Sequence, residues 1–292
     1  MTGVAPALAE PQIGAAPAVA TSMCASVKYP RLAARISSGI RTALAGRTHS
    51  VVGLKASAPG FGLTCWLNQN AHFYAASVIK VTILSALLFK EHGPSHLTRQ
   101  QRNLAFLMIT QSNNYAATAL WDEVGMRGMR VFLRRAAMPH TILSQAWGLT
   151  LITARDELTL LHLLTRPGDV LGKYSRRYVL TLMAEVIPAE RWGVSAGAAR
   201  GITVHIKNGW LPYPEGDDWN INSIGAFTGN DISYQIVILT GPPAAGGQGE
   251  GYGIQTIEDA ADVINRILAR RLGLRSAPVR LPDAAALAEP GG

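Results

Sequence analysis

Cysteine is scarce in this 292-residue chain, which contains only Cys24 and Cys65. Two cysteines are too few for a scaffold built on disulfides or for a self-contained zinc site. Two interpretations remain open: one bridge that ties the N-terminal arm to the body of the protein, or two separate buried thiols. We expect no metal and no other cofactor.

Charged residues are also few, at 16% of the chain, whereas hydrophobic residues make up 48%. A chain of this length and composition buries a sizeable core and is not intrinsically disordered. Its longest dense apolar run, from Val78 to Phe89, is interrupted by Lys80 and is too short to span a bilayer. The sequence therefore predicts a globular protein without a membrane span.

Lysine is rare among the cations, since only six of the 27 Lys and Arg residues are lysines. The net charge of +8 would allow an anionic partner. The arginines are scattered, however, except for a cluster between residues 266 and 275, at the end of an expected helix, where cations offset the helix dipole. Because basic and aromatic residues do not alternate elsewhere, we expect no nucleic-acid partner.

Both ends of the chain are rich in Ala, Pro and Gly without periodicity, so residues 1–29 and 277–292 are predicted to be tails. Residues 1–23 lack the basic and strongly apolar stretches of a signal peptide, but Ala7-Leu8-Ala9 and Ala18-Val19-Ala20 resemble small-residue cleavage sites. We therefore hypothesise that an exported precursor begins upstream, which places the protein in the cell envelope or outside the cell. Such a location favours the disulfide.

Apolar spacing predicts one domain over residues 30–276. Since sequential strands usually lie side by side, the order of elements indicates an α/β (α+β) fold. We expect a five-stranded, largely antiparallel sheet with terminal helices on a face and an all-α lobe inserted between strands two and three. The sheet lobe comprises residues 30–76 and 201–276, and the helical lobe comprises residues 77–200. The expected elements are helices at 31–44 and 254–272, and strands near 49–56, 62–67, 202–207, 219–227 and 232–239.

Ser77 and Lys80 form a Ser-x-x-Lys pair where the predicted hairpin gives way to a helix that is apolar on every side. Residues three apart share a helix face, so the lysine amine can reach the serine hydroxyl. Burial favours the neutral amine, which could take the serine proton and make Ser77 a nucleophile. On this segment alone, an equally good interpretation makes Ser77 a helix N-cap and Lys80 a surface residue that extends its amine into water.

Two further motifs stand at element boundaries. Ser112-Asn113-Asn114 lies between two helical patterns, and Lys207-Asn208-Gly209 ends the strand after the helical region. Taken singly, the first is typical of a helix cap and the second of a turn. Together with Ser77 and Lys80, in this order and at these positions, they resemble the active-site motifs of serine β-lactamases and penicillin-binding proteins, most closely of the compact class A type.

The resemblance implies an acyl-serine enzyme. It assigns Ser77 as the acylated nucleophile and Lys80 as its base, and it gives Ser112 the transfer of a proton to the leaving group. Asn114 would bind a substrate amide and bridge the lobes, and Lys207 would hold a substrate carboxylate. The substrate would be a small anionic acyl compound, such as a β-lactam or a peptide-like amide or ester.

The same resemblance places the oxyanion hole at the backbone amides of Ser77 and Trp210 and lets the substrate lie against Gly209. Asn208 stands in a substrate-binding motif, but it replaces the usual Thr or Ser and so lacks a hydroxyl that would help to bind a carboxylate. Asn113 replaces the usual Asp. The choice of substrate is therefore open.

A third departure concerns deacylation. Class A enzymes activate the deacylating water with a Glu in the loop before the helix that here begins near Thr153, and the corresponding residues 139–150 contain no carboxylate. We therefore expect a serine hydrolase that deacylates slowly. We also expect the protein to be a monomer. Alternatives within the fold are a transacylase or a D,D-peptidase, and an alternative of another class is a catalytically silent binding protein.

Three other motifs fit their usual chemistry poorly. Residues Gly193–Gly197 match the nucleophile elbow of α/β-hydrolases, but no strand pattern precedes them. His92 and His96 have the spacing of zinc ligands, but a Gly-Pro pair between them would break a helix. The cluster Gly246–Gly253 lacks a complete dinucleotide-binding motif. We predict a loop or connection at each of the three.

Overall fold

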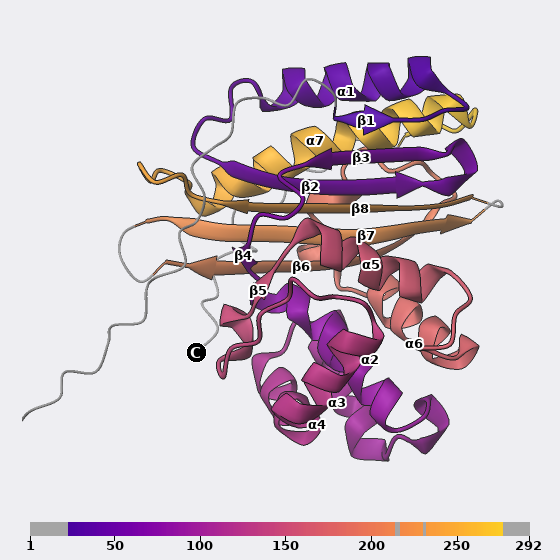
Figure 1. The fold of residues 1–292 in the computed structure, drawn as a ribbon, viewed down its shortest axis with the longest axis vertical. Helices are drawn as coiled ribbons and strands as arrows, with labels where there is room; N and C mark the ends of the chain where they lie inside the picture. Colours follow the sequence, from indigo (N-terminus) through magenta and orange to yellow (C-terminus); the bar gives the residue numbers. More distant parts are fainter. Residues whose placement is uncertain (1–22, 214–216, 230–231, 277–292) are drawn as a thin grey trace, which may run out of the picture.

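The centre of the protein is one antiparallel sheet, seen in a computed structural model that describes residues 23–213, 217–229 and 232–276 (Figure 1). Its strands follow the order β1-β3-β2-β8-β7-β6. The predicted fold class, a sheet interrupted by a helical lobe, is confirmed, with six strands in place of five. The strands are β1 (Cys24–Ala25), β2 (Val51–Ala58), β3 (Leu63–Leu67), β6 (Thr203–Pro212), β7 (Trp219–Gly229) and β8 (Ile232–Gly241).

The sixth strand comes from a segment that the sequence assigned to a tail. Met23 and Cys24 are buried, and β1 pairs with β3. The folded part therefore begins before the predicted boundary at residue 30. The prediction missed this strand because two residues are too few to show a period in the sequence. The remaining tail residues, 1–22 and 277–292, lie outside the part of the chain that the structure describes.

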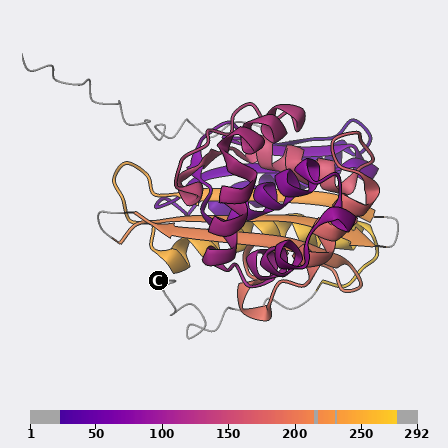
Figure 2. The same ribbon diagram turned by 90° about the horizontal axis from the view of Figure 1, so that it is seen from below.

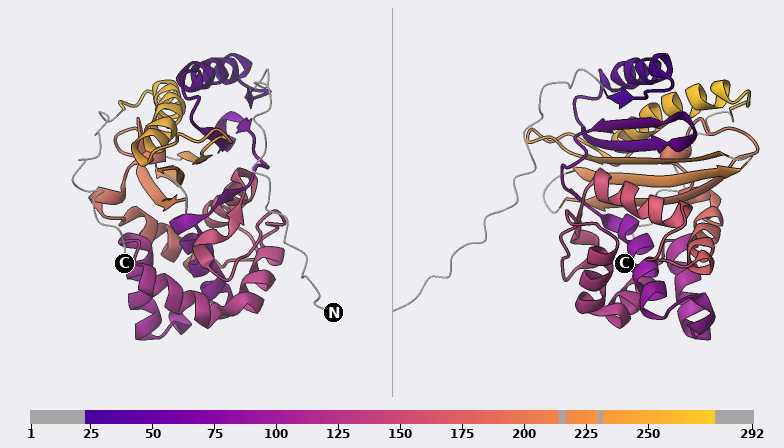
Figure 3. Two further views of the ribbon diagram at one scale, coloured as in Figure 1. Left: turned by 90° about the vertical axis from the view of Figure 1, so that its left-hand side faces the viewer. Right: turned by 45° about the vertical axis from the view of Figure 1, so that its right-hand side comes forward.

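Two helices, α1 (Pro30–Leu44) and α7 (Glu250–Arg271), lie side by side on one face of the sheet (Figures 1 and 3). They approach closely at Gly39, where a side-chain carbon would lie 2.5 Å from a methyl group of Val263. Each helix buries an apolar stripe against the sheet, made by Ile36, Ile40, Ile257 and Ile264. These helices form the outer layer, away from the helical lobe.

The helical lobe covers the opposite face (Figure 2). Its central helix, α2, is buried on every side, as its sequence predicts. A second small sheet, of β4 (Phe73–Tyr74) and β5 (Leu151–Ile152), joins the segment before α2 to the segment before α5. The helices of the lobe are α2 (Ile79–Lys90), α3 (Arg99–Thr110), α4 (Asn114–Arg135), α5 (Ala154–Thr165) and α6 (Lys173–Ala184). Among the described residues, no helix has the length and apolar character needed to cross a membrane.

Cys24 and Cys65 face each other across β1 and β3 and form a disulfide. Of the two arrangements that the sequence left open, the structure has the bridge. The two cysteines are 41 residues apart in the sequence, one before α1 and one after it. The bridge therefore ties the first described residues to β3 of the sheet.

The disulfide leads to a first prediction. The double variant Cys24→Ala/Cys65→Ala should lose about 3 kcal/mol of unfolding free energy, because the bridge restricts the unfolded chain over a long loop. Urea denaturation of the oxidised wild type and of the variant measures the difference. Reduced wild type serves as a control and should unfold with the variant, whereas equal midpoints for the oxidised wild type and the variant would contradict the prediction.

Candidate active site

Three segments far apart in the sequence bring the predicted active-site residues together. Ser77 lies in a short 3₁₀ turn that leads directly into α2, and Lys80 lies in the first turn of that helix. The junction of α3 and α4 supplies Ser112 and Asn114, and β6 supplies Lys207. The site therefore lies between the sheet and the helical lobe.

Ser112 connects the two lysines. Lys207 Nζ donates a hydrogen bond to Ser112 Oγ over 2.8 Å. Lys80 Nζ donates to the carbonyl oxygen of Ser112 over 2.5 Å and lies 3.3 Å from its Oγ. The backbone of Ser112 has a φ of 55°, in the left-handed region that residues with side chains rarely adopt. This conformation lets both oxygens of one serine face the lysines.

Asn113 and Asn114 have different roles. Asn113 Oδ1 accepts a hydrogen bond from Ala116 N over 2.8 Å and caps α4. Asn114 Oδ1 instead accepts a hydrogen bond from Lys80 Nζ over 2.8 Å. The helix-cap interpretation of this motif therefore applies to Asn113, while Asn114 belongs to the site.

Lys80 is fully buried, so the interpretation as a surface residue is wrong. Desolvation, and next the positive charge of Lys207, lower the pKa of Lys80 to about 6, against an opposing effect of Glu190. A neutral amine has two N–H groups and one lone pair. The backbone carbonyl oxygen of Ser112 and the side-chain Oδ1 of Asn114 accept its two hydrogens. The lone pair of Lys80 is then available to accept a proton.

Ser77 is half-buried, and Lys80 bonds to Ser112 and Asn114 rather than to its hydroxyl. Catalytic hydrogen bonds are often long before substrate binds. The indole ring of Trp147 lies over Lys80 Nζ, 5.0 Å from the ring centroid, and its Nε1 donates to Thr118 Oγ1. Trp147 is a site residue that the motifs did not reveal, because it lies in an irregular loop.

Gly209 allows β6 to pass directly against the Ser77 turn. A Cβ at Gly209 would lie 2.7 Å from the backbone N of Ser77 and 2.8 Å from that of Val78. Such distances exclude any side chain unless the backbone moves. Trp210 follows on β6, at the edge of the sheet, and its ring packs against Trp192 with 5.9 Å between centroids. The structure thus brings the predicted glycine next to the predicted nucleophile.

Two buried asparagines of β7 hold the segment before Ser77. Asn220 Nδ2 and Asn222 Nδ2 each donate to the carbonyl oxygen of Tyr74 over 2.7 Å, and Asn222 Nδ2 also donates to that of Ala75. Both side chains are fully buried. These hydrogen bonds fasten the Ser77 turn to β7, the strand next to β6. No sequence motif indicates this role.

Lys207 is fully buried and is paired with a carboxylate that the sequence analysis missed. Its Nζ lies 3.4 Å from Glu190 Oε2 and donates to the carbonyl oxygen of Asn208 over 2.9 Å. Burial lowers the pKa of Lys207, and the charge and hydrogen bond of Glu190 oppose that effect. Glu190 ends the 3₁₀ turn Pro188–Glu190 in the connection before β6, where no spacing relates it to Lys207.

The side chain of Asn208, a residue expected to bind substrate, is turned to the protein interior. Its side chain is fully buried, and Nδ2 donates to the carbonyl oxygens of Glu190 and Trp192 over 2.9 and 3.0 Å. Its Oδ1 accepts a hydrogen bond from Ser223 Oγ over 2.6 Å. Because three of its hydrogen-bonding positions serve the fold, the amide secures the connection before β6 to the sheet.

The two carboxylates nearest in sequence to residues 139–150 are both turned inward. Asp156 accepts hydrogen bonds from His140 N and Thr141 Oγ1 and contacts the His140 ring, so it fastens the start of this loop. Glu157 is fully buried without a hydrogen-bond partner for either oxygen, and burial raises its pKa to about 8. Burial thus favours the protonated form of this enclosed carboxyl.

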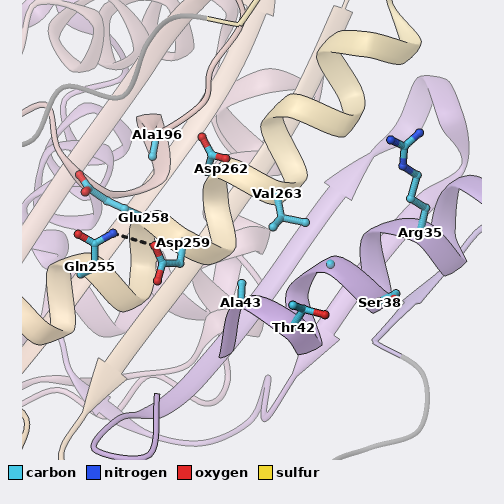
Figure 4. A pocket seen from close by; sticks show the side chains of 11 residues that line it. Arg35, Ser38, Thr42, Ala43, Ala196, Gln255, Glu258, Asp259, Asp262 and Val263 are labelled. Carbon is cyan, nitrogen blue, oxygen red and sulfur yellow. Dashed lines mark hydrogen bonds between the residues drawn. The ribbon is translucent and has the colours of Figure 1, made fainter. Parts of the chain in front are cut away.

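The remaining motifs lie outside the site. Ser195 is in a 3₁₀ turn, and its Oγ donates to the carbonyl oxygen of Arg191, so it is not a nucleophile elbow. In the described ranges no three His, Cys, Asp or Glu side chains lie close enough together to hold a metal ion, and His92 and His96 therefore belong to no such group. A pocket of about 830 Å³ lies between α1 and α7, on the face of the sheet away from Lys80 (Figure 4). This pocket therefore does not coincide with the candidate active site.

Solved structures support the fold. A class A β-lactamase from Bacteroides cellulosilyticus matches 81% of this chain and 98% of its own, with 16% identity and a TM-score of 0.69. PBP-A matches 82% of this chain and 96% of its own, with 18% identity and a TM-score of 0.67. A β-lactamase from Streptosporangium roseum matches 82% and 99%, with 21% identity and a TM-score of 0.66. No curated protein shows significant sequence similarity to the chain.

The family is shown by sequence. Residues 91–268 match the model of the β-lactamase enzyme family. The match includes Ser112, Asn114 and Lys207, and it begins after Ser77 and Lys80, which the structure brings to the same site. With more than half of its residues matched and with the fold of class A β-lactamases, the chain belongs to the β-lactamase enzyme family.

Proposed function

We propose that this protein is a serine hydrolase that forms an acyl-enzyme on Ser77. The observation that carries the proposal is the buried network in which Ser112 links Lys80 to Lys207 beside the Ser77 turn. It provides a desolvated amine, a relay hydroxyl and a fixed cation in one place. A structural role alone would not require two fully buried lysines, because each costs desolvation free energy.

In the proposed reaction, Lys80 takes the hydroxyl proton of Ser77, and Ser77 Oγ attacks the carbonyl carbon of the substrate. The backbone amides of Ser77 and Trp210 stabilise the oxyanion. When the bond from the carbonyl carbon to the leaving nitrogen or oxygen breaks, Ser112 gives its proton to the leaving group. Ser112 regains a proton from the protonated Lys80, to which it is already close.

We propose β-lactam-like or peptide-like amides and esters as the substrate class. One structure that this chain matches, with 18% identity and a TM-score of 0.67, is an acyl-enzyme complex of a PBP-A variant with penicillin G. A D,D-peptidase or a transacylase would use the same acyl-enzyme. The Cys24–Cys65 disulfide supports a location outside the cytoplasm as part of the proposal.

The function is tested by incubation with a chromogenic β-lactam. We expect a stoichiometric burst followed by slow turnover, because residues 139–150 offer no carboxylate and Asp156 and Glu157 are turned inward. Without a general base, deacylation should be slower by about 10²- to 10⁴-fold. Mass spectrometry should find the adduct on the Ser77 peptide, and Ser77→Ala should remove it. A silent binding protein would give no adduct, and rapid turnover without a burst would reveal a deacylating base.

A second prediction concerns the base. Because the pKa of Lys80 is about 6 and the neutral amine is the active form, the acylation rate should rise with pH up to about 6 and level off above it. Lys80→Met should slow acylation by about 10²- to 10⁴-fold and abolish this pH dependence. Lys90→Met is the matched control, since Lys90 lies at the far end of α2. Acylation of Lys80→Met at the wild-type rate would refute the assignment.

A third prediction concerns the close approach at Gly209. Gly209→Ala must push β6 away from the Ser77 turn, so we expect acylation to fall by at least about tenfold, since misplaced reacting groups lose their orientation. Gly251→Ala, in the first turn of α7 with no atom within 4 Å of its added carbon, is the control and should acylate normally. Acylation at the same rate in both variants would count against the role of Gly209.

A further inference from the structure

We propose that Glu190 is a specificity-determining residue whose carboxylate fills the place beside Lys207 that a substrate carboxylate would take. The enzyme then favours acyl substrates that are uncharged at this position. This inference rests on the proposed function, and it revises the expectation of an anionic substrate that came from the resemblance alone.

The first observation is the set of partners of Lys207. An ammonium group has three hydrogens to donate. Lys207 Nζ has three acceptors, Ser112 Oγ, Glu190 Oε2 and the carbonyl oxygen of Asn208, and no part of its surface reaches solvent. A substrate carboxylate would have to displace one of them. Ser112 is needed for proton transfer and the Asn208 oxygen is backbone, so Glu190 is the partner in competition.

The second observation is the charge of the site. Lys207 Nζ lies 3.4 Å from Glu190 Oε2 and has two further acceptors, an arrangement that fits an ammonium group with Glu190 as its counter-ion. Arg191 follows Glu190 but donates to the carbonyl oxygens of Ala184 and Val204, which directs its guanidinium to the backbone. The cation of the site is thus already balanced, and a second carboxylate would meet the charge of the first.

The third observation is that Asn208 positions Glu190. Asn208 Nδ2 donates to the carbonyl oxygen of Glu190 over 2.9 Å, and the backbone N of Glu190 donates to that of Ile187. Asn208 is the residue that replaces a hydroxyl expected to bind a substrate carboxylate. One replacement therefore removes a ligand for an external carboxylate and secures an internal one. The Glu190 side chain is 13% exposed, so it lies at the boundary between Lys207 and solvent.

Acylation by a penicillin and by its methyl ester tests the proposal. Mass spectrometry of the Ser77 adduct gives both rates. Wild type should acylate with the ester at least as fast as with the free acid. Glu190→Gln should shift the ratio toward the acid by about tenfold or more, because a neutral amide competes less well for Lys207 than a carboxylate and no longer repels the substrate carboxylate. Glu185→Gln makes the same charge change at an exposed site after α6 and should keep the wild-type ratio.

A measurement that needs no activity separates this proposal from the proposed function. Acetate should raise the melting temperature of Glu190→Ala, which leaves room beside Lys207 for a replacement counter-ion, and it should leave wild type and Glu185→Ala unchanged. Acetamide, which is uncharged, should have no effect on any of the three. Absence of a Ser77 adduct together with rescue by acetate would refute the hydrolase and retain the anion site.

Three outcomes would overturn the inference. The first is a wild type that acylates much faster with the acid than with the ester, a result that does not depend on the folding of any variant. The second is an unchanged ratio in a folded Glu190→Gln together with no response of a folded Glu190→Ala to acetate. The third is a Glu190→Gln that changes only the rate of deacylation, which would make Glu190 a base for water instead.

Discussion

Two fully buried lysines share one serine, and the proposed chemistry of the site depends on which of them keeps its proton. Two ammonium groups this close in a medium of low dielectric would repel strongly. The structure settles the conflict unequally: Lys80 loses its proton readily, and Lys207 keeps a carboxylate beside it. The proposed division into a base and a fixed cation therefore agrees with the position of Glu190, which pairs with Lys207 and not with Lys80.

The geometry of the site depends on the sheet. Gly209 brings β6 against the Ser77 turn, and Asn220 and Asn222 reach across from β7 to fasten the residues before it. The turn with Ser77, the proposed nucleophile, thus lies against a strand that is itself paired along its length. A rigid sheet behind a short turn is a suitable support for reacting atoms, because small displacements are costly to catalysis.

The sequence predicted what depends on local pattern. Helical spacing and alternating apolar residues indicated the interrupted sheet, and the three motifs indicated Ser77, Lys80, Ser112, Asn114 and Lys207, which the structure gathers at one site. Glu190 and Trp147 could not be found this way, since they lie in irregular segments and reach the lysines only through the tertiary fold. Asn208 stands in one of the motifs, but the motif does not show that its side-chain amide bonds to the protein interior. The two-residue strand β1 was missed because it is too short for a period.

The strand β1 also affects which edge of the sheet is open to association with another chain. Of the two edges of the described sheet, β6 carries the candidate site, and at the other edge β1 covers part of β3 with only two residue pairs. The Cys24–Cys65 bridge adds a covalent link to the hydrogen bonds that Met23 and Ser26 make beside this short strand. Unpaired strand edges are templates for association between chains. The intact bridge thus helps to keep this part of the β3 edge covered, and after its reduction only noncovalent contacts would hold β1 there.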